Sequence, residues 1–159
     1  MNGRMYNLSK SLFGEDFEID ICKAKIESID AIKKIADVNK KQIGFVIKSG
    51  LLKQIENGEV LIAKNDNIIV GFCNYHHRRD SQTTMYEICV EKVHRRCNVG
   101  TLLLNALKKE STAENKTKIV LKMPEHLNVD NFYQSNGFKI VDITKSKTGT
   151  VLKVFQYDC

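Results

Sequence analysis

The stretch from Tyr86 to Leu107, YEICVEKVHRRCNVGTLLLNAL, constrains the fold of this chain more than any other. Its first part has the apolar residues of a strand, its middle is basic, and the apolar run that begins at Val99 is typical of a helix. The first N–H groups of a helix have no partner within it, and the helix dipole places about half a positive charge there. The order strand, basic turn, helix therefore predicts a binding place for a phosphate or diphosphate.

The residues of this turn suit such a ligand. Arg95 and Arg96 add full positive charges beside the helix start. Gly100 and Thr101 stand in the first helical turn, where a large side chain would keep phosphates away from the backbone amides. Asn98 can adopt a left-handed backbone or cap the helix. We therefore expect contacts from Arg95, Arg96, Cys97, Asn98, Val99, Gly100 and Thr101.

Two motifs of this chain resemble motifs of the GNAT acyltransferase superfamily. The segment Val90–Leu104, with Arg-x-x-Asn-x-Gly-Thr at its centre, resembles the pyrophosphate-binding motif Arg/Gln-x-x-Gly-x-Gly/Ala, although Asn98 stands where the family commonly has its first glycine. Arg96 and Cys97 also replace the usual small and basic residues. These departures put the geometry of the loop in question more than the helix start.

The second motif lies further along the chain. The segment Leu127–Phe138, LNVDNFYQSNGF, resembles the later GNAT motif, in which a tyrosine stands four residues before a Gly-Phe pair, as Tyr133 does before Gly137 and Phe138. The resemblance extends more loosely from about Phe17 to Phe155. Two motifs in this order are more specific than either alone, so the chain is identified as resembling a GNAT N-acetyltransferase.

Hydrophobic patterns and turn residues predict the order of elements. We expect strands and helices in the order β-α-α-β-β-β-α-β-α-β-β. This is an α/β (α+β) fold, and the resemblance implies a mixed, mostly antiparallel sheet with a central splayed parallel strand pair and flanking helices. The expected elements are a strand from Phe17, a helix capped by Ser28, a helical region at Ile43–Ile55 interrupted by Gly50, a hairpin turning at Asn65–Asn67, a strand ending at Val90, a helix from Val99 to about Glu114, a strand at Lys118–Met123, a short helix at Asp130–Ser135, and a hairpin of Gly137–Ile143 with Thr150–Gln156.

Length and composition set the class of protein. A chain of 159 residues with no Pro/Gly/Ser-rich linker predicts one domain at residues 17–159, preceded by a flexible tail or interaction arm at residues 1–16. The net charge of +6 favours anionic ligands, including a nucleotide cofactor, acidic proteins or RNA. A solvated lysine-rich surface is the simpler account, so we expect no nucleic-acid partner.

The sequence predicts a cytoplasmic protein with no membrane contact and no metal. No apolar run approaches the roughly 20 residues of a membrane span, and the N-terminus lacks the apolar core of a signal peptide. The five cysteines are odd in number and scattered, without a C-x-x-C pair, so we expect reduced thiols. Cys97, in the basic turn, is the one whose pKa could be lowered for a nucleophilic role, but no convincing base stands near it in sequence.

The resemblance implies transfer of an acetyl group from acetyl-CoA to a primary amine, by direct attack in a ternary complex. Backbone groups near Cys89 and Val90 would bind the pantetheine arm and polarise the thioester carbonyl. An amine with a pKa of about 10.4 is protonated at pH 7, and removing its proton costs about 4.6 kcal/mol. Glu87, two residues before Cys89, is the first candidate for the base, and His76 and His77 are the next. An ordinary surface role for Glu87 is equally open.

The resemblance assigns Tyr133 as the acid that protonates the departing thiolate, and it adds Tyr133 and Asp130 to the cofactor contacts. A tyrosine hydroxyl is a weaker acid than a thiol by only about 1.5 pKa units, so this donation is feasible. The alternative is that Tyr133 and Phe132 pack the short helix against the sheet. His94 and His126 flank the two motifs and are open to contact with the cofactor.

Other functions compete with this one because a fold does not establish a reaction. A non-catalytic module that binds CoA or RNA is one alternative, and transfer of a different acyl group is another. The acceptor is a small-molecule amine or a protein or peptide amine, and the sequence does not choose between them. A homodimer is also left open.

Overall fold

The computed structural model describes residues 5–10 and 16–159, which fall into two compact units. The first unit comprises the chain up to Tyr75 together with Glu87–Leu107, and the second comprises His76–Tyr86 and Lys108–Cys159. The chain passes from one unit to the other within the strands β4 (Ile68–His77) and β5 (Gln82–Val90) and within the helix α4 (Val99–Ala113).

The strands of the first unit form an antiparallel array. β1 (Met5–Lys10) pairs with β2 (Asp16–Lys23), β2 pairs with β3 (Val60–Asn65), and β3 pairs with β4. We did not predict β1, because its residues show little periodicity. It lies within the segment expected to be a tail, and the rest of that segment falls outside the described residues except for Asp16, which begins β2. The flexibility of a tail at residues 1–16 stays a prediction.

The turn between β3 and β4 forms as its composition predicts. Asp66 and Asn67 have φ angles of 47° and 65°. Two successive residues with positive φ give the turn a twist that matches antiparallel strands, and Asp and Asn adopt this conformation at low cost. The predicted hairpin at Asn65–Asn67 is confirmed.

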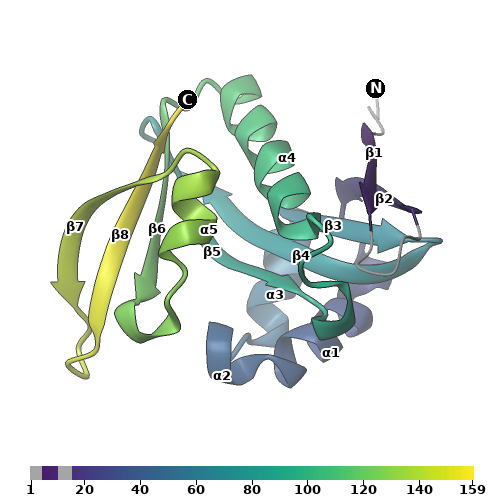
Figure 1. The fold of residues 1–159 in the computed structure, drawn as a ribbon, viewed down its shortest axis with the longest axis horizontal. Coiled ribbons are helices and arrows are strands. Elements are labelled where there is room, and N and C mark those ends of the chain that lie inside the picture. Colours follow the sequence, from purple (N-terminus) through teal and green to yellow (C-terminus); the bar gives the residue numbers. More distant parts are fainter. Residues whose placement is uncertain (1–4, 11–15) are drawn as a thin grey trace. The chain divides into compact units, whose positions relative to one another are not determined.

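Three helices gather on one side of β3 and β4 (Figure 1). They are α1 (Ile29–Val38), α2 (Lys40–Ile43) and α3 (Lys48–Glu56), and a 3-10 turn at Ile26–Ser28 precedes them. Their apolar residues recur at helical spacing, so they share a core with alternate residues of the strands. That core comprises Ala24, Ile29, Ile32, Ile35, Ala36, Val46, Leu51, Ile55, Val60, Ile62, Phe72 and Cys89.

Two details of this helical region differ from the prediction. Ser28 precedes α1, as expected, but its side chain makes no capping hydrogen bond because a 3-10 turn already leads into the helix. The helical region breaks at Gly44, whose φ of 80° ends α2, and not at Gly50, which lies inside α3. Only Gly44 has a positive φ, a backbone conformation outside the helical region that glycine adopts at low cost, and the helix ends there.

The other face of these strands meets α4. A side chain added at Gly71 of β4 would lie 3.5 Å from Leu103 of α4 and 3.0 Å from the carbonyl oxygen of Cys89. Gly71 therefore permits a close approach of β4 to the end of β5. The end of β5 leads, through a 3-10 turn at Lys92–His94, into the predicted phosphate turn and α4.

The second unit contains the parallel pair. The first three residues of β5 pair in parallel with those of β6 (Lys118–Pro124), and both strands run on beyond this pairing. β8 (Val151–Asp158) pairs antiparallel with β6 and with β7 (Lys139–Lys145). The helix α5 (Asp130–Ser135) follows β6 and a 3-10 turn at Glu125–Leu127. The predicted mixed, mostly antiparallel sheet with one parallel pair and flanking helices is confirmed, and the splaying of that pair stays a prediction.

Within residues 5–10 and 16–159, no helix has both the length and the apolar character that a membrane span needs.

Candidate active site

Arg95 ties the predicted phosphate turn to the helices of the first unit. Its Nε donates a hydrogen bond to the backbone oxygen of Val90 at 3.1 Å, and its terminal nitrogen donates to Gln42 Oε1 at 3.1 Å and to Asn39 Oδ1. Asn39 is itself buried and donates to the carbonyl oxygen of Ile35 at 2.8 Å. The guanidinium of Arg95 is thus engaged by protein groups, and its predicted contact with a phosphate stays a prediction.

His94 fastens the same turn on its other side. Its Nδ1 lies 3.2 Å from Glu91 Oε2, and its Nε2 lies 3.5 Å from Asn65 Nδ2 in the β3–β4 hairpin. The backbone N–H of Glu91 donates to the oxygen of Val70 at 2.7 Å. Side chains from two directions therefore fix the turn before α4 begins.

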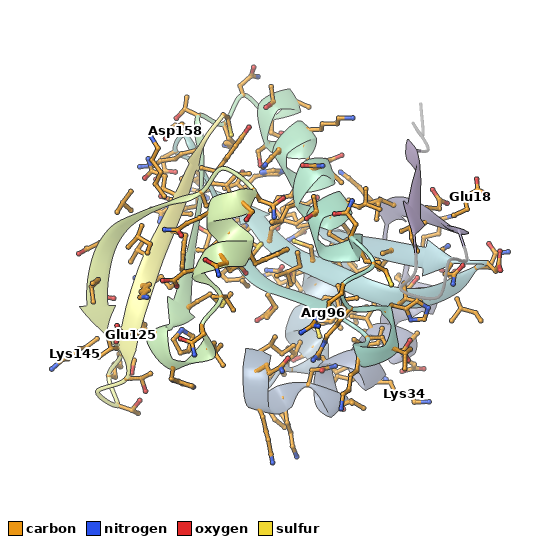
Figure 2. All side chains as sticks on the ribbon, in the orientation of Figure 1. Glu18, Lys34, Arg96, Glu125, Lys145 and Asp158 are labelled. Carbon is orange, nitrogen blue, oxygen red and sulfur yellow. The ribbon has the colours of Figure 1, made fainter. Side chains whose placement is uncertain are left out.

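Within the turn, side chains alternate between the interior and the solvent. Cys97 and Val99 are 5% and 1% exposed, whereas Arg96 and Asn98 are exposed and have φ angles of 62° and 66°. Figure 2 labels Arg96 on the turn that leads into α4. The left-handed backbone predicted for Asn98 is confirmed. Cys97 and Val99 are buried, and their predicted contacts with a ligand stay a prediction.

The start of α4 supplies the expected donors. Its first i→i−4 hydrogen bond runs from the N–H of Leu102 to the oxygen of Asn98 at 3.1 Å. The N–H groups of Val99, Gly100 and Thr101 come before that bond, so the helix itself offers them no carbonyl. These N–H groups and the exposed Arg96 give the start of α4 a positive character.

Glu87 forms a polar pair with Asn74 in the first unit. Asn74 Nδ2 donates a hydrogen bond to Glu87 Oε2 at 2.7 Å. Burial raises the pKa of Glu87 above its ordinary value, and the bond from Asn74 opposes that rise. A partly buried carboxyl group with a raised pKa is better matched to proton uptake near neutral pH than an exposed one.

The strand around Glu87 is otherwise apolar and neutral. Burial raises the pKa of Cys89 to about 11, an effect that the nearby charge of Arg95 reduces. Burial, and then the charge of Glu87, raise the pKa of Cys73 on β4. Both thiols are therefore protonated at neutral pH.

The two histidines proposed as further bases lie in the second unit. His77 Nδ1 is 2.8 Å from Thr83 Oγ1, and Thr83 is fully buried. His76 and His77 therefore belong to a different compact unit from Glu87.

Tyr133 is packed among aromatic rings in the second unit. It is 2% exposed, and the centres of the Phe155, Phe132 and Phe138 rings lie 5.0, 5.1 and 5.7 Å from its own. The packing that sequence offered as the alternative role of Tyr133 is therefore present. Proton transfer by the hydroxyl stays a prediction.

The end of α5 explains the spacing of Tyr133, Gly137 and Phe138. The N–H of Phe138 donates to the oxygen of Tyr133 at 3.0 Å, and the N–H of Gly137 donates to the oxygen of Gln134 at 3.0 Å. Gly137 has a φ of 86°. These are the two bonds of a Schellman helix ending, in which the residue after the glycine contacts the residue five positions before it. The motif therefore has a local structural cause.

Two lysines complete this end of the second unit. Lys108 Nζ donates to the oxygen of Asn136 at 2.6 Å and lies 4.4 Å from the centre of the Tyr157 ring. Partial burial lowers the pKa of Lys108. Asp130, predicted to contact the cofactor, pairs with Lys153 at 2.5 Å. The carboxylate of Asp130 is thus already balanced by a positive charge.

Sequence reasoning missed Asn74 and Lys108. Asn74 is a polar residue within the apolar run IIVGFCNY, and that is the one signal that could have drawn attention to it. Lys108 resembles any other lysine on a helix, so its partners emerge only from the fold. Among the described residues, no group of three or more His, Cys, Asp or Glu side chains could hold a metal ion.

Comparison with known proteins was made at the level of sequence and of fold. The model of the GNAT acetyltransferase domain matches residues 56–140, which is more than half of the chain. No curated protein matches the sequence.

Several solved structures have the same fold. The PaiA N-acetyltransferase of Thermoplasma acidophilum, in complex with coenzyme A, has a TM-score of 0.77 at 19% identity, over 89% of this chain and 99% of its own. A GNAT-family acetyltransferase of Bacillus cereus has a TM-score of 0.73 at 24% identity, over 88% and 96%. The ribosomal-protein-S18-alanine N-acetyltransferase of Escherichia coli has a TM-score of 0.73 at 15% identity, over 88% and 93%.

Proposed function

The chain belongs to the GNAT acetyltransferase family, and from this premise we propose that it transfers an acetyl group from acetyl-CoA to a primary amine. The observation that carries the proposal is the hydrogen bond between Asn74 and Glu87. Glu87 lies on β5, two residues before Cys89, and Asn74 lies on β4. The amine would attack the thioester directly while both substrates are bound.

Acetyl-CoA fits the turn before α4. Its diphosphate needs donors and positive charge, and the first N–H groups of α4 and the exposed Arg96 supply both. Arg96 and Asn98 of this turn are exposed, and Gly100 at the start of α4 is partly exposed, so these residues can be reached by a ligand. The PaiA relative was solved with coenzyme A, which supports the same co-substrate here. Backbone groups near Cys89 and Val90 would bind the pantetheine arm.

Glu87 would remove a proton from the ammonium form of the acceptor, directly or through a water. The amine nitrogen then forms a bond to the thioester carbon, and the carbon–sulfur bond breaks. A carboxylate can act only when it is ionised, so activity should fall as the pH drops through the raised pKa of Glu87. The nitrogen loses one proton before it attacks and a second once the bond to carbon has formed, and Glu87 accepts each in turn and releases it to solvent. The phenolate left when Tyr133 protonates the thiolate regains its proton from solvent.

Tyr133 would donate the proton that the leaving thiolate takes up. Its aromatic neighbours hold the ring in one place, which is the condition for a proton donor of fixed geometry. If Tyr133 serves only in packing, the thiolate takes its proton from water. The same proposal includes a contact of Asp130 with the cofactor. It also includes a small-molecule amine or a protein or peptide amine as the acceptor, a cytoplasmic location and a homodimer.

The direct experiment incubates the protein with acetyl-CoA and a panel of amines and peptides. Release of free thiol and the mass of the product are followed together. Acetylated product from one class of acceptor is the expected result. Tight CoA binding with no acyl transfer to any acceptor would favour a non-catalytic module, and RNA binding without CoA binding would favour an RNA-binding one. Products from propionyl-CoA but not from acetyl-CoA would mean that the protein transfers an acyl group other than acetyl.

Gly100→Glu tests the place of the co-substrate. The substitution adds bulk and negative charge in the first turn of α4, so calorimetry should detect no CoA binding. Gly50→Glu is the matched control, because Gly50 lies in the helix α3 with no atom within 4 Å of an added side chain. Unchanged CoA affinity of a folded Gly100→Glu protein would mean that the diphosphate binds elsewhere.

A further inference from the structure

Asn74 is an unusual residue for its position on β4. It is 7% exposed and stands on a strand whose neighbours are apolar. Its Nδ2 donates to Glu87 Oε2 at 2.7 Å, whereas its Oδ1 is buried and has no hydrogen-bond partner in the described part of the chain. A buried acceptor without a partner is costly to a folded protein. Its presence beside a titratable group therefore calls for a reason.

The chemistry of the two side chains supplies that reason. An ionised carboxylate only accepts hydrogen bonds, whereas a carboxylic acid has one O–H that donates. An asparagine carries both a donor and an acceptor, and its terminal torsion is roughly two-fold. A half-turn of the amide therefore exchanges Nδ2 for Oδ1 without moving the rest of the side chain.

We propose that Asn74 is a positioning residue that keeps Glu87 hydrogen-bonded both before and after Glu87 accepts the proton of the acceptor amine. The inference rests on the proposed function of Glu87 as the base. Before transfer, Nδ2 donates to the carboxylate, as observed. In the transfer an N–H bond of the ammonium breaks and an O–H bond forms on Glu87. The amide then turns, and Oδ1 accepts from the new O–H until the proton passes to solvent.

The surroundings make Glu87 the group that titrates. On β4, burial and the charge of Glu87 raise the pKa of Cys73. On β5, burial raises the pKa of Cys89 to about 11, and Arg95 reduces that rise. Both thiols stay neutral near pH 7, so neither competes with Glu87 for the proton. Asn74 is the polar side chain that adjusts to the change.

Two variants separate positioning from mere structure. Asn74→Leu removes both the donor and the acceptor, and Asn74→Asp keeps the shape but offers only acceptors. A charge-assisted bond to the carboxylate is stronger than the bond to the acid, so its loss in Asn74→Leu should move the acid limb of the kcat/KM profile up by about half to one pH unit. A second carboxylate in Asn74→Asp should move that limb further up.

At the pH optimum, kcat of Asn74→Leu should fall about tenfold, whereas the KM for acetyl-CoA should stay within about twofold. Asn105→Leu, at an exposed position of α4, is the control that should leave both unchanged. If Asn74 had only a structural role, Asn74→Leu would lower the stability of the protein without moving the acid limb of the kcat/KM profile.

A readout that needs no turnover is the NMR titration of the wild-type protein. The side-chain NH2 resonances of Asn74 should shift with the same midpoint as the carboxyl carbon of Glu87, because the amide turns when Glu87 is protonated. NH2 resonances that do not follow Glu87 would overturn the inference, as would an unmoved acid limb in both variants. Failure of the proposed function gives a different result. If Glu87→Gln turned over at the wild-type rate, Glu87 would not be the base, whereas the NMR titration would still report whether Asn74 follows the protonation of Glu87.

Discussion

Glu87 and Tyr133, the two residues assigned to proton transfer, have opposite surroundings within their own units. Glu87 is partly buried, holds one polar partner, and its pKa is raised by burial. Tyr133 is almost wholly buried and is enclosed by three phenylalanine rings. The surroundings of Glu87 suit a group that changes its charge, whereas those of Tyr133 hold a ring in place.

This difference helps to interpret Glu87 and Tyr133. The spacing of Tyr133, Gly137 and Phe138 is fully accounted for by a helix ending and its apolar contact. Nothing in local structure accounts for a carboxyl group paired with a buried amide on neighbouring strands. Substitutions at Glu87 should therefore affect activity above all, whereas most substitutions at Tyr133 should affect stability first.

The largest effect is expected for Tyr133→Ala. Removing a buried aromatic ring leaves a cavity among Phe132, Phe138 and Phe155, so the free energy of unfolding should fall by about 3 to 5 kcal/mol. Urea unfolding followed by circular dichroism measures this. Tyr86→Ala is the control, because Tyr86 is 44% exposed and should cost well under half as much. Equal losses in the two variants would contradict the contrast in packing.

Gly71→Ala should be the next largest. Its added carbon would lie 3.0 Å from the carbonyl oxygen of Cys89, and backbone cannot move as a flexible side chain can. We expect a loss of about 1 to 3 kcal/mol in urea unfolding and weaker CoA binding, because the end of β5 is displaced. Gly50→Ala, in open space within a helix, should instead gain about 0.5 to 1 kcal/mol. A stable Gly71→Ala with wild-type CoA affinity would show that β4 and β5 can separate without cost.

Tyr133→Phe divides the two roles of this side chain. It keeps the ring and removes only the hydroxyl, so the protein should fold and bind acetyl-CoA within a few-fold of wild type. Turnover should fall at least about tenfold if the hydroxyl protonates the thiolate. Stopped-flow and steady-state rates at saturating substrate provide the measurement. Wild-type turnover would leave Tyr133 as a packing residue alone.

The smallest effect concerns the helix ending. Gly137 and Gly149 have φ angles of 86° and 87°, so an alanine is strained at both. Only at Gly137 does the added carbon meet a neighbour, the Tyr157 ring at 3.3 Å, whereas nothing lies within 4 Å at Gly149. Gly137→Ala should therefore cost about 1 kcal/mol more than Gly149→Ala in urea unfolding. Equal costs would mean that the ring moves aside freely.

Much of the fold could be predicted from the sequence. Alternating apolar residues and turn residues place the hairpin at Asn65–Asn67, the helix from Val99 and the final two strands, because these signals are local. β1 could not be predicted, since it depends on pairing with β2 rather than on its own pattern. The break at Gly44 was missed because a sequence does not reveal which glycine takes positive φ.

The site is less predictable than the fold. The turn at Arg95–Thr101 is visible in sequence because it combines charge, small residues and a helix start. The hydrogen bonds of Arg95 to Asn39 and Gln42 are not visible in the sequence, because these partners lie more than fifty residues away in the chain. Asn74 and Glu87 likewise meet only through the pairing of strands. Long-range polar contacts are the part of an active site that sequence patterns do not encode locally.

The measurement that tests the central claim most directly is the pH dependence of kcat/KM for wild type and Glu87→Gln, with the best acceptor of the amine panel. Gln keeps the shape of the side chain and removes the base. We expect turnover to fall about 100-fold at neutral pH and to recover partly as the pH rises toward the pKa of the amine, while the acid limb set by Glu87 disappears. A Glu87→Gln profile that overlies that of the wild type would contradict the account and remove Glu87 from the mechanism.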